Sequence, residues 1–156
     1  MPNCGRIKYH EKQIEGRCGQ HAINNLLQAR RSTSNNLNKI AEKLSEEFGI
    51  DKEDLNGDDG YYDVSVIVKF LVDRGYEVQQ LQESEFYKMS RRQSNRLLGY
   101  ILGDGRHWKS IIKTNNVDCY CVIDSMDTEK EHIKVLGEYM YENNFEIAIK
   151  VLKPTV

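Results

Sequence analysis

The stretch KQIEGRCGQHAINNLLQ, from Lys12 to Gln28, carries the clearest signs of both fold and chemistry in the chain. Its second half repeats apolar residues at the spacing of one helix face, at Ala22, Ile23, Leu26 and Leu27. Cys18 stands where this helix should begin, and Gln13 stands five residues earlier. First-turn amides are unpaired and partly positive, so a thiolate placed there is stabilised. The stretch predicts a helix over 18–28 with a nucleophilic thiol at its start, or else an inert buried cysteine, the commoner case.

The composition is that of a water-soluble chain of one domain. Its 156 residues carry a formal net charge of −2, which provides no overall basic surface for nucleic acid. No apolar run approaches the roughly 18 residues that cross a membrane, and the N-terminus lacks a signal-peptide core. We expect residues 1–156 to form one catalytic domain that is monomeric and acts in the cytoplasm. Action in the nucleus, or delivery into another cell, stays open.

Four cysteines should be free thiols in a reducing compartment. Cys119 and Cys121 are two residues apart in a strand-like run, and the chain has no Cys-x-x-Cys. That spacing argues against zinc, so we expect no metal and no cofactor.

The order of the predicted elements favours the α+β class. A second helix is expected over 37–48, capped by Ser34 or Asn35, and a third between Asp63 and Gly75. Strand patterns follow over 76–81, 97–102, 108–112, 117–123 and 145–151, with a further helix over 129–143. Helices first and antiparallel strands second predict N-terminal helices packed on an antiparallel sheet.

His107 is the best placed of the four histidines to act as a base for Cys18, because it enters a strand directly after a turn. His10 lies in an irregular segment, and His21 shares the helix of Cys18 with little freedom to align. His132 falls on the predicted helix 129–143 and is expected at the surface.

A hairpin register provides His107 with a carboxylate partner. If Asn115 and Asn116 form a tight turn, paired positions sum to 231 and Asp124 lies directly opposite His107. Such a pair fixes the imidazole tautomer and leaves the other nitrogen for a thiol. Alternatively, the pair is an incidental feature of a hairpin.

Gln13 completes a set that occurs in the order Gln, Cys, His, Asp. Acyl transfer develops negative charge on a carbonyl oxygen, which a side-chain amide and a backbone N–H can stabilise together. The set is typical of a papain-type thiol hydrolase.

Segments in the same order along most of the chain resemble the Josephin family, the deubiquitinating module of ataxin-type proteins. They are YHEKQIEGRCGQHAINNLLQ (9–28), GYYDVSVIVKFL (60–71), RHW (106–108), VIDSM (122–126) and NNFEIAIKV (143–151). The resemblance implies a papain-like Josephin fold that hydrolyses peptide or isopeptide bonds at the C-terminus of ubiquitin or polyubiquitin. It assigns Cys18 as nucleophile, His107 as base, Asp124 as the residue that orients it, and Gln13 as oxyanion donor.

The resemblance also implies where ubiquitin would bind. Val64 and Ser65 match a family surface that meets ubiquitin, and Trp108 follows the catalytic histidine. The stretch before GYYDVS is shorter than in ataxin-type members, so their helical hairpin must be reduced here. Arg74 stands where those members have a tryptophan.

Two other readings remain open. Bacteriocin-type double-glycine peptidases also place a Gln five residues before Cys-Gly, followed by His and Asp, although they are usually joined to a transporter. Alternatively, the chain could be a ubiquitin-binding module without catalysis.

Overall fold

A six-stranded antiparallel sheet with the strand order β1-β6-β2-β3-β4-β5 forms the centre of the molecule. The structure is a computed structural model that describes residues 9–11, 18–56, 61–88, 95–114, 120–124, 131–133 and 136–154. The strands are β1 (Glu77–Gln82), β2 (Leu97–Gly103), β3 (Trp108–Lys113), β4 (Tyr120–Ile123), β5 (Glu131–Ile133) and β6 (Ile147–Leu152). The helices are α1 (Cys18–Leu27), α2 (Ser34–Phe48), α3 (Lys52–Asn56), α4 (Val64–Asp73), the 3₁₀ helix η3 (Glu83–Lys88) and α5 (Leu136–Glu142).

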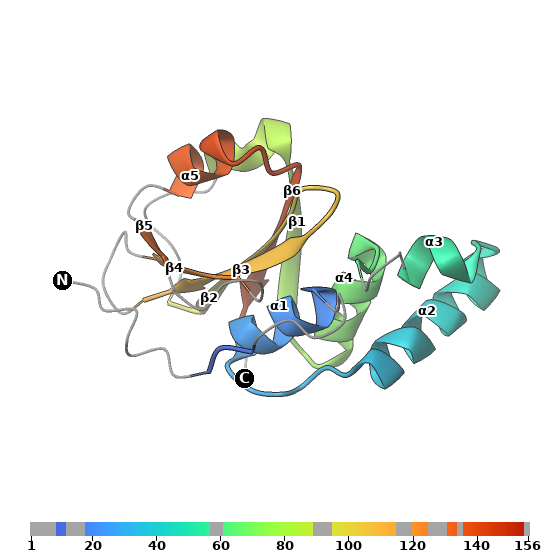
Figure 1. The fold of residues 1–156 in the computed structure, drawn as a ribbon. Coiled ribbons are helices and arrows are strands. Elements are labelled where there is room, and N and C mark those ends of the chain that lie inside the picture. The colour runs from blue at the N-terminus through green and yellow to red at the C-terminus, as the bar shows by residue number, and fades with distance from the viewer. Residues whose placement is uncertain are drawn as a thin grey trace.

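Each face of the sheet has its own hydrophobic core. Helix α1 covers one face, whereas α5 and η3 cover the other (Figure 1). Alternation along the strands supplies both cores: Ile101 packs on the α1 side, and its neighbour Leu102 packs on the α5 side. The predicted α+β class is therefore confirmed.

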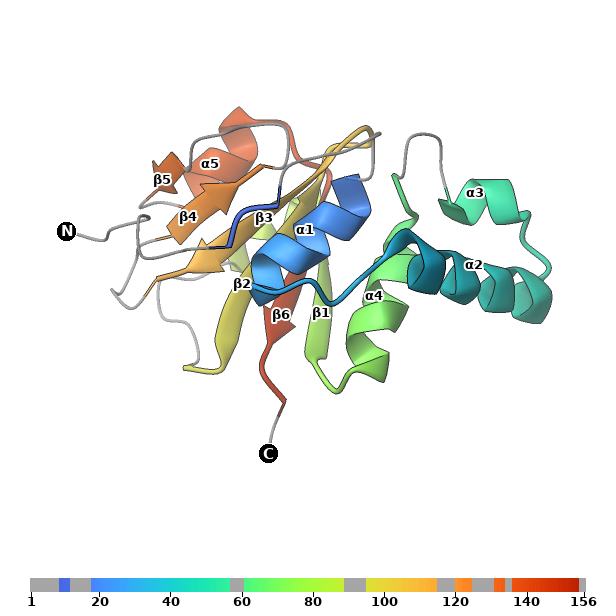
Figure 2. The same ribbon diagram turned by 60° about the horizontal axis from the view of Figure 1, so that its bottom comes forward.

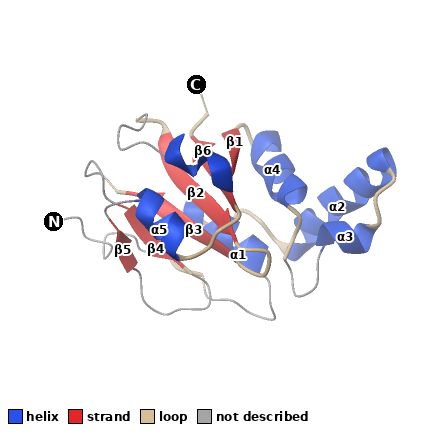
Figure 3. Cartoon of the chain, turned by 90° about the horizontal axis from the view of Figure 1, so that it is seen from above, coloured by secondary structure: helices blue, strands red, loops and turns tan. Residues whose placement is uncertain are grey.

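Helices α2, α3 and α4 form an arm beside the β1 edge of the sheet (Figures 2 and 3). Helix α2 begins with a capping box, in which Thr33 and Asn36 exchange side-chain bonds with each other's backbone amides. It ends at Gly49, whose φ of 68° lies in the left-handed region. Asp63 caps α4 as predicted, by accepting from the backbone N–H of Ser65.

Three predictions about secondary structure need correction. The cap of α2 is Thr33, one residue before the expected Ser34. Among the described residues, the helix expected over 129–143 is confined to α5, because residues 131–133 pair with β4 as the edge strand β5. His132 consequently lies on a strand and not on a helix. The sequence pattern did not predict α3 or η3.

The expectation of four thiols is also wrong, because Cys121 is in a disulfide whose partner lies outside the described residues. Within the described ranges, no group of three or more His, Cys, Asp or Glu side chains is placed to hold a metal ion. A search of that same part of the chain finds no helix both long enough and apolar enough to span a membrane.

Candidate active site

The turn between β2 and β3 positions His107. The backbone N–H of Asp104 donates to the carbonyl of His107 at 3.4 Å, so Gly105 and Arg106 are the two central turn residues. Gly105 has a φ of 92°, which a glycine adopts without strain. The Asp104 side chain accepts from the backbone N–H groups of Arg106 and His107 at 2.9 and 2.8 Å. The imidazole therefore projects from a turn whose backbone is fixed on both sides.

Asp124, directly after β4, is the hydrogen-bond partner of this imidazole. Nε2 of His107 lies 2.6 Å from Oδ1 of Asp124, and both side chains are largely buried, with 14% and 13% of their surface exposed. The predicted contact is therefore present, but the predicted register is wrong. Ser110 pairs with Ile123, so paired positions sum to 233 and His107 is a diagonal neighbour of Asp124. A shift of two residues keeps both side chains on the same face, which is why the contact survives the error.

Cys18 is the first residue of α1, and its thiol hydrogen-bonds to His107. Because Asp124 occupies Nε2, the ring nitrogen left for the thiol is Nδ1. Burial by itself would lower the pKa of His107. However, the hydrogen bonds to Asp124 and Cys18, together with the charges of those residues, raise it from 6.5 to about 9. The imidazole is thus held protonated at neutral pH, in the form that pairs with a thiolate.

The segment Tyr9–Glu11 is attached to α1 and to Gln28, the residue that follows it, by side-chain amides that bond to its backbone as a neighbouring strand would. Gln28 accepts from the N–H of Tyr9 and donates to its carbonyl, at 3.1 and 2.9 Å. Asn25 does the same for Glu11, at 2.5 and 3.2 Å. Between these two residues, Nε2 of His10 lies 2.8 Å from the backbone oxygen of Asp124. The segment therefore joins the helix of the nucleophile to the strand end that carries Asp124.

A partly buried polar cluster completes this attachment. Oε1 of Glu11 lies 2.5 Å from Nδ1 of His21 and accepts from Asn24 at 3.0 Å, and the hydroxyl of Tyr9 donates to the other oxygen. Burial works to raise the pKa of Glu11, but the hydrogen bonds from His21, Tyr9 and Asn24 lower it below its usual value. His21 is 4% exposed and engaged with Glu11, so it contributes to structure beside the site rather than serving as the base.

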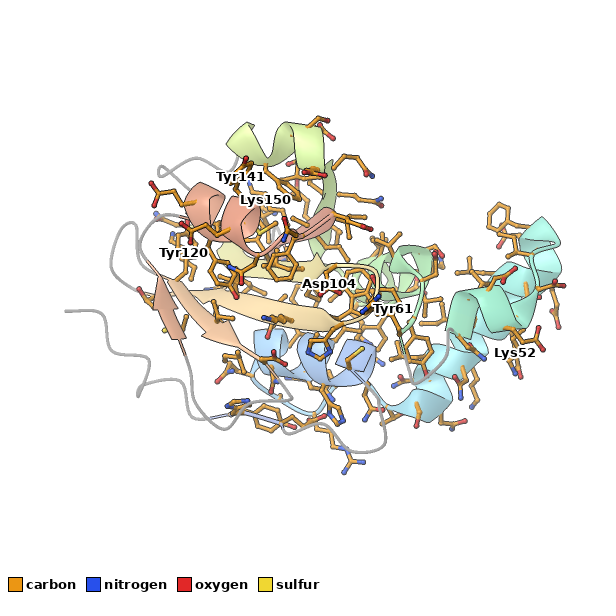
Figure 4. All side chains as sticks on the ribbon, turned by 45° about the horizontal axis from the view of Figure 1, so that its top comes forward. Lys52, Tyr61, Asp104, Tyr120, Tyr141 and Lys150 are labelled. Carbon is orange, nitrogen blue, oxygen red and sulfur yellow. The ribbon has the colours of Figure 1, made fainter. Side chains whose placement is uncertain are left out.

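An aromatic pair lies next to the thiol. The Tyr61 ring stacks on Trp108 with centroids 4.9 Å apart, and its hydroxyl accepts from the N–H of Gly105 at 3.1 Å. Burial raises the pKa of Tyr61 to about 12, with further increases from the nearby charges of Asp104, Cys18 and Glu146. Figure 4 shows Tyr61 beside Asp104 at the turn. The phenol ring therefore lies at the turn, close enough to the start of α1 for Cys18 to affect its pKa.

Trp108, expected to contact substrate, is only 1% exposed. Its indole N–H donates to the carbonyl of Tyr62 at 2.9 Å, and one ring face is covered by Tyr61. A Cβ atom at Gly103 would approach the ring to 2.5 Å, which explains a glycine at that position. Tyr61 is thus the more exposed aromatic group, and substrate contact by Trp108 stays a prediction.

The other predicted residues have these positions. Val64 and Ser65 begin α4, where Ser65 donates to the capping carboxylate of Asp63. The Arg74 guanidinium lies 4.5 Å over the Phe70 ring. Gln13 and the turn at 115–116 lie outside the described residues. The structure thus brings together Cys18, His107 and Asp124, and their catalytic roles remain predictions.

The sequence reasoning passed over three residues in this region: His10, Glu11 and Lys109. His10 and Glu11 lie in the segment 9–28 quoted above. Glu11 bonds to Asn24 and Asn25 of its NNLLQ part, whereas Gln28 bonds to Tyr9 and His10 bonds to Asp124. Pairing the polar residues at the two ends of this segment would have indicated that residues 9–11 are attached to α1. The position of Lys109 opposite Asp124 could be recognised only from the correct hairpin register.

The family follows from a comparison of the sequence. The Josephin family model matches residues 13–146, which include the cysteine, the histidine and the aspartate described above. The chain belongs to the Josephin family. It is therefore a cysteine protease with a papain-like fold. A comparison with curated protein sequences gives no significant match.

Solved structures with a similar fold include a peptidase domain and a protease that belong to transporters. The peptidase domain of Streptococcus ComA, a bifunctional ABC transporter involved in quorum sensing, aligns with a TM-score of 0.56 and 12% identity, over 94% of this Josephin chain and 99% of that one. A double-glycine-motif protease from an AMS/PCAT transporter, in complex with its leader peptide, aligns with a TM-score of 0.54 and 11% identity, over 94% and 91% of the two chains. At these identities the likeness concerns the fold alone.

Proposed function

We propose that this Josephin chain is a deubiquitinase that hydrolyses peptide or isopeptide bonds after the C-terminal glycine of ubiquitin. The single observation that carries the proposal is the hydrogen-bonded series of Cys18, His107 and Asp124 in a chain of this family. Each member lies at the start or end of a regular element of the packed core. Such placement supports a preorganised site.

The first half of the reaction is acylation. The Cys18 thiolate attacks the carbonyl carbon of the terminal glycine, so a C–S bond forms and the carbonyl π electrons move to oxygen. The backbone N–H of Cys18 and the amide of Gln13 would stabilise this oxyanion. Protonated His107 then donates its proton to the leaving nitrogen as the C–N bond breaks. A thioester on Cys18 and a free amine result.

The second half returns the enzyme to its starting state. His107, now neutral, accepts a proton from water as the water attacks the thioester carbonyl. The tetrahedral intermediate collapses with cleavage of the C–S bond, and thiolate and imidazolium are restored. A pKa of about 9 for His107 supports this cycle at neutral pH, because the imidazolium is the resting form. Asp124 holds the ring throughout.

The proposal makes ubiquitin or polyubiquitin the partner of a monomeric, single-domain enzyme acting in the cytoplasm. Val64 and Ser65 would contribute to the ubiquitin surface, since they lie half-buried at the start of α4. Tyr61 and Trp108 would form the aromatic wall beside the nucleophile, against which a glycine tail without side chains can pack closely.

A second candidate is a double-glycine peptidase that removes leader peptides. It is favoured by the similarity in fold to the ComA peptidase domain and to the double-glycine-motif protease. Both candidates cleave after paired glycines with the same groups, so they differ in what precedes the glycines.

The deciding experiment compares two substrates at matched concentrations. One is full-length ubiquitin with a C-terminal fluorogenic amide, and the other is a leader peptide ending in Gly-Gly with the same reporter. We expect the ubiquitin substrate to have the higher kcat/KM, and we expect Cys18→Ala to abolish turnover while still binding ubiquitin. A higher kcat/KM for the leader peptide would replace the proposal with the second candidate.

A further inference from the structure

Lys109 lies directly opposite Asp124 in the hairpin that carries the site. The register in which Ser110 pairs with Ile123, continued by one residue, pairs Lys109 with Asp124. Nζ of Lys109 is 3.6 Å from Oδ2 of Asp124, whereas Oδ1 of the same carboxylate meets Nε2 of His107 at 2.6 Å. Each carboxylate oxygen therefore faces a different cation.

The Lys109 ammonium is itself held in place. It lies 5.5 Å from the centroid of the Phe145 ring, a side chain that is 2% exposed. The lysine side chain is 24% exposed, so the charge is only partly hydrated and its attraction to the carboxylate is less screened than at an open surface. His10 meanwhile bonds to the backbone oxygen of Asp124. Asp124 is thus held at both side-chain oxygens and at its backbone.

We propose that Lys109 is a positioning residue for the catalytic histidine: it engages Oδ2 of Asp124 so that Oδ1 stays directed at His107. This inference rests on the proposed function for its activity readout, but not for its structural readout. A carboxylate facing a single partner can rotate about its terminal bond and present either oxygen. A second cation on the opposite oxygen removes that freedom, at a small cost because both groups are already packed.

The same geometry gives an unusual expectation for an amide at position 124. If the side-chain oxygen of the amide in the Asp124→Asn variant accepts from His107, the NH₂ group of that amide points at the Lys109 ammonium. Two donors then face each other, which is unfavourable for both. Removing the ammonium should therefore harm the parent protein and help the Asp124→Asn variant.

The charges around His107 also decide in which direction its pKa changes when Lys109 is replaced. Its ring faces Cys18 on α1 and Asp124 after β4, its backbone N–H binds Asp104 of the turn, and Lys109 approaches from β3. Glu146 and the phenol of Tyr61 lie at the same turn. The hydrogen bond to Asp124 raises the pKa of His107, so losing the group that directs Oδ1 at the ring should lower that pKa, whereas losing the Lys109 charge alone would raise it.

The test uses the parent protein, Lys109→Met, Asp124→Asn and the double variant. Lys150→Met serves as the matched control, because it removes the same charge from β6, which β2 separates from β3. We expect Lys109→Met to lower kcat/KM on the ubiquitin reporter roughly three- to tenfold, and Lys109→Arg to recover most of the loss. The double variant should be more active than Asp124→Asn alone. Lys150→Met should match the parent.

A structural readout separates this inference from the proposed substrate. Titration of the His107 ring by NMR, assigned with His107→Gln, should give a lower pKa in Lys109→Met than in the parent and Lys150→Met, because the hydrogen bond to Asp124 is weakened. A higher pKa would report only the loss of the Lys109 charge and would overturn the positioning role. If no protein cleaves the ubiquitin reporter but the lower pKa is found, the substrate proposal fails and the positioning role stands. Equal His107 titration in Lys109→Met and Lys150→Met, or a double variant less active than Asp124→Asn, would overturn the role of Lys109.

Discussion

Replacing Glu11 by glutamine tests how the segment before the nucleophile is held. The Glu11 carboxylate accepts from His21, Asn24 and Tyr9, and it lies two residues before the expected oxyanion donor Gln13. Glutamine has nearly the same shape but presents an NH₂ group where one oxygen accepted. One of the three donors must then face another donor. The substitution therefore removes charge and pairing without creating a cavity.

The magnitude follows from the contacts that are lost. Hydrogen bonds to a charged, partly buried carboxylate contribute about 1.5–3 kcal/mol each, so losing one and weakening a second should destabilise the fold by about 2–4 kcal/mol. For a chain of this length, that corresponds to a fall in Tm of roughly 5–15 °C. Because the segment leads into Gln13, we also expect kcat to fall more than KM changes.

The sign of the pH dependence is fixed by the direction of the pKa shift. The pKa of Glu11 is lowered in the fold from its ordinary value of 4.5, so its stabilising effect is present above that pH and is lost as the pH falls through the folded value. The Tm difference between Glu11→Gln and the parent should thus be large at pH 7 and should shrink below about pH 4.5.

The assay is thermal unfolding by circular dichroism at both pH values, with Glu47→Gln as the control. Glu47 is exposed on α2 and loses the same charge on substitution. If Glu11→Gln and Glu47→Gln unfold at the same temperature at pH 7, the cluster does not hold the segment. A Tm difference that stays constant as the pH is lowered through 4.5 and well below it would refute the role of the carboxylate charge.

Four further predictions concern the site and its surroundings. Gln13→Ala should lower the single-turnover rate by roughly 10²–10³-fold with little change in affinity, and a loss of affinity alone would assign Gln13 another role. In the parent, kcat/KM should fall as the pH rises through about 9, where His107 loses its proton, and this limb should move to lower pH in Asp124→Asn. Activity should decrease from parent to Asp124→Asn to Asp124→Ala, and equal activity would direct attention to Asp118 or Asp127. Gly103→Ala should lower the Tm because the new Cβ meets the Trp108 ring, and an unchanged Tm would show that the indole has room to move.

The parts predicted correctly from the sequence are those set by local pattern. The start of α1 at Cys18, the turn before His107 and the run of β2 each follow from periodicity and turn residues within a short window. The contact between His107 and Asp124 was also predicted correctly. Side chains alternate between the two faces of a strand, so a register error of two residues leaves both side chains on the same face.

The parts predicted wrongly depend on contacts between distant segments. The described β3–β4 pairs, from Lys113 with Tyr120 to Ser110 with Ile123, set a register two residues away from the one that a tight turn at Asn115 and Asn116 predicts. Residues 131–133 pair with β4 at the edge of the sheet, although their local pattern favours a helix. The side chains that bond to Tyr9–Glu11 come from residues 10 to 19 positions further along the chain. Hydrophobic periodicity does not predict such hydrogen bonds.

The central claim is that Cys18 reacts covalently with the C-terminus of ubiquitin. Its most direct test is incubation with ubiquitin carrying a C-terminal electrophile, followed by intact-mass measurement and identification of the modified peptide. We predict one adduct per chain, on Cys18, abolished in Cys18→Ala and strongly reduced in His107→Gln. Reversible binding without an adduct, or an adduct on another cysteine that persists in Cys18→Ala, would contradict the claim.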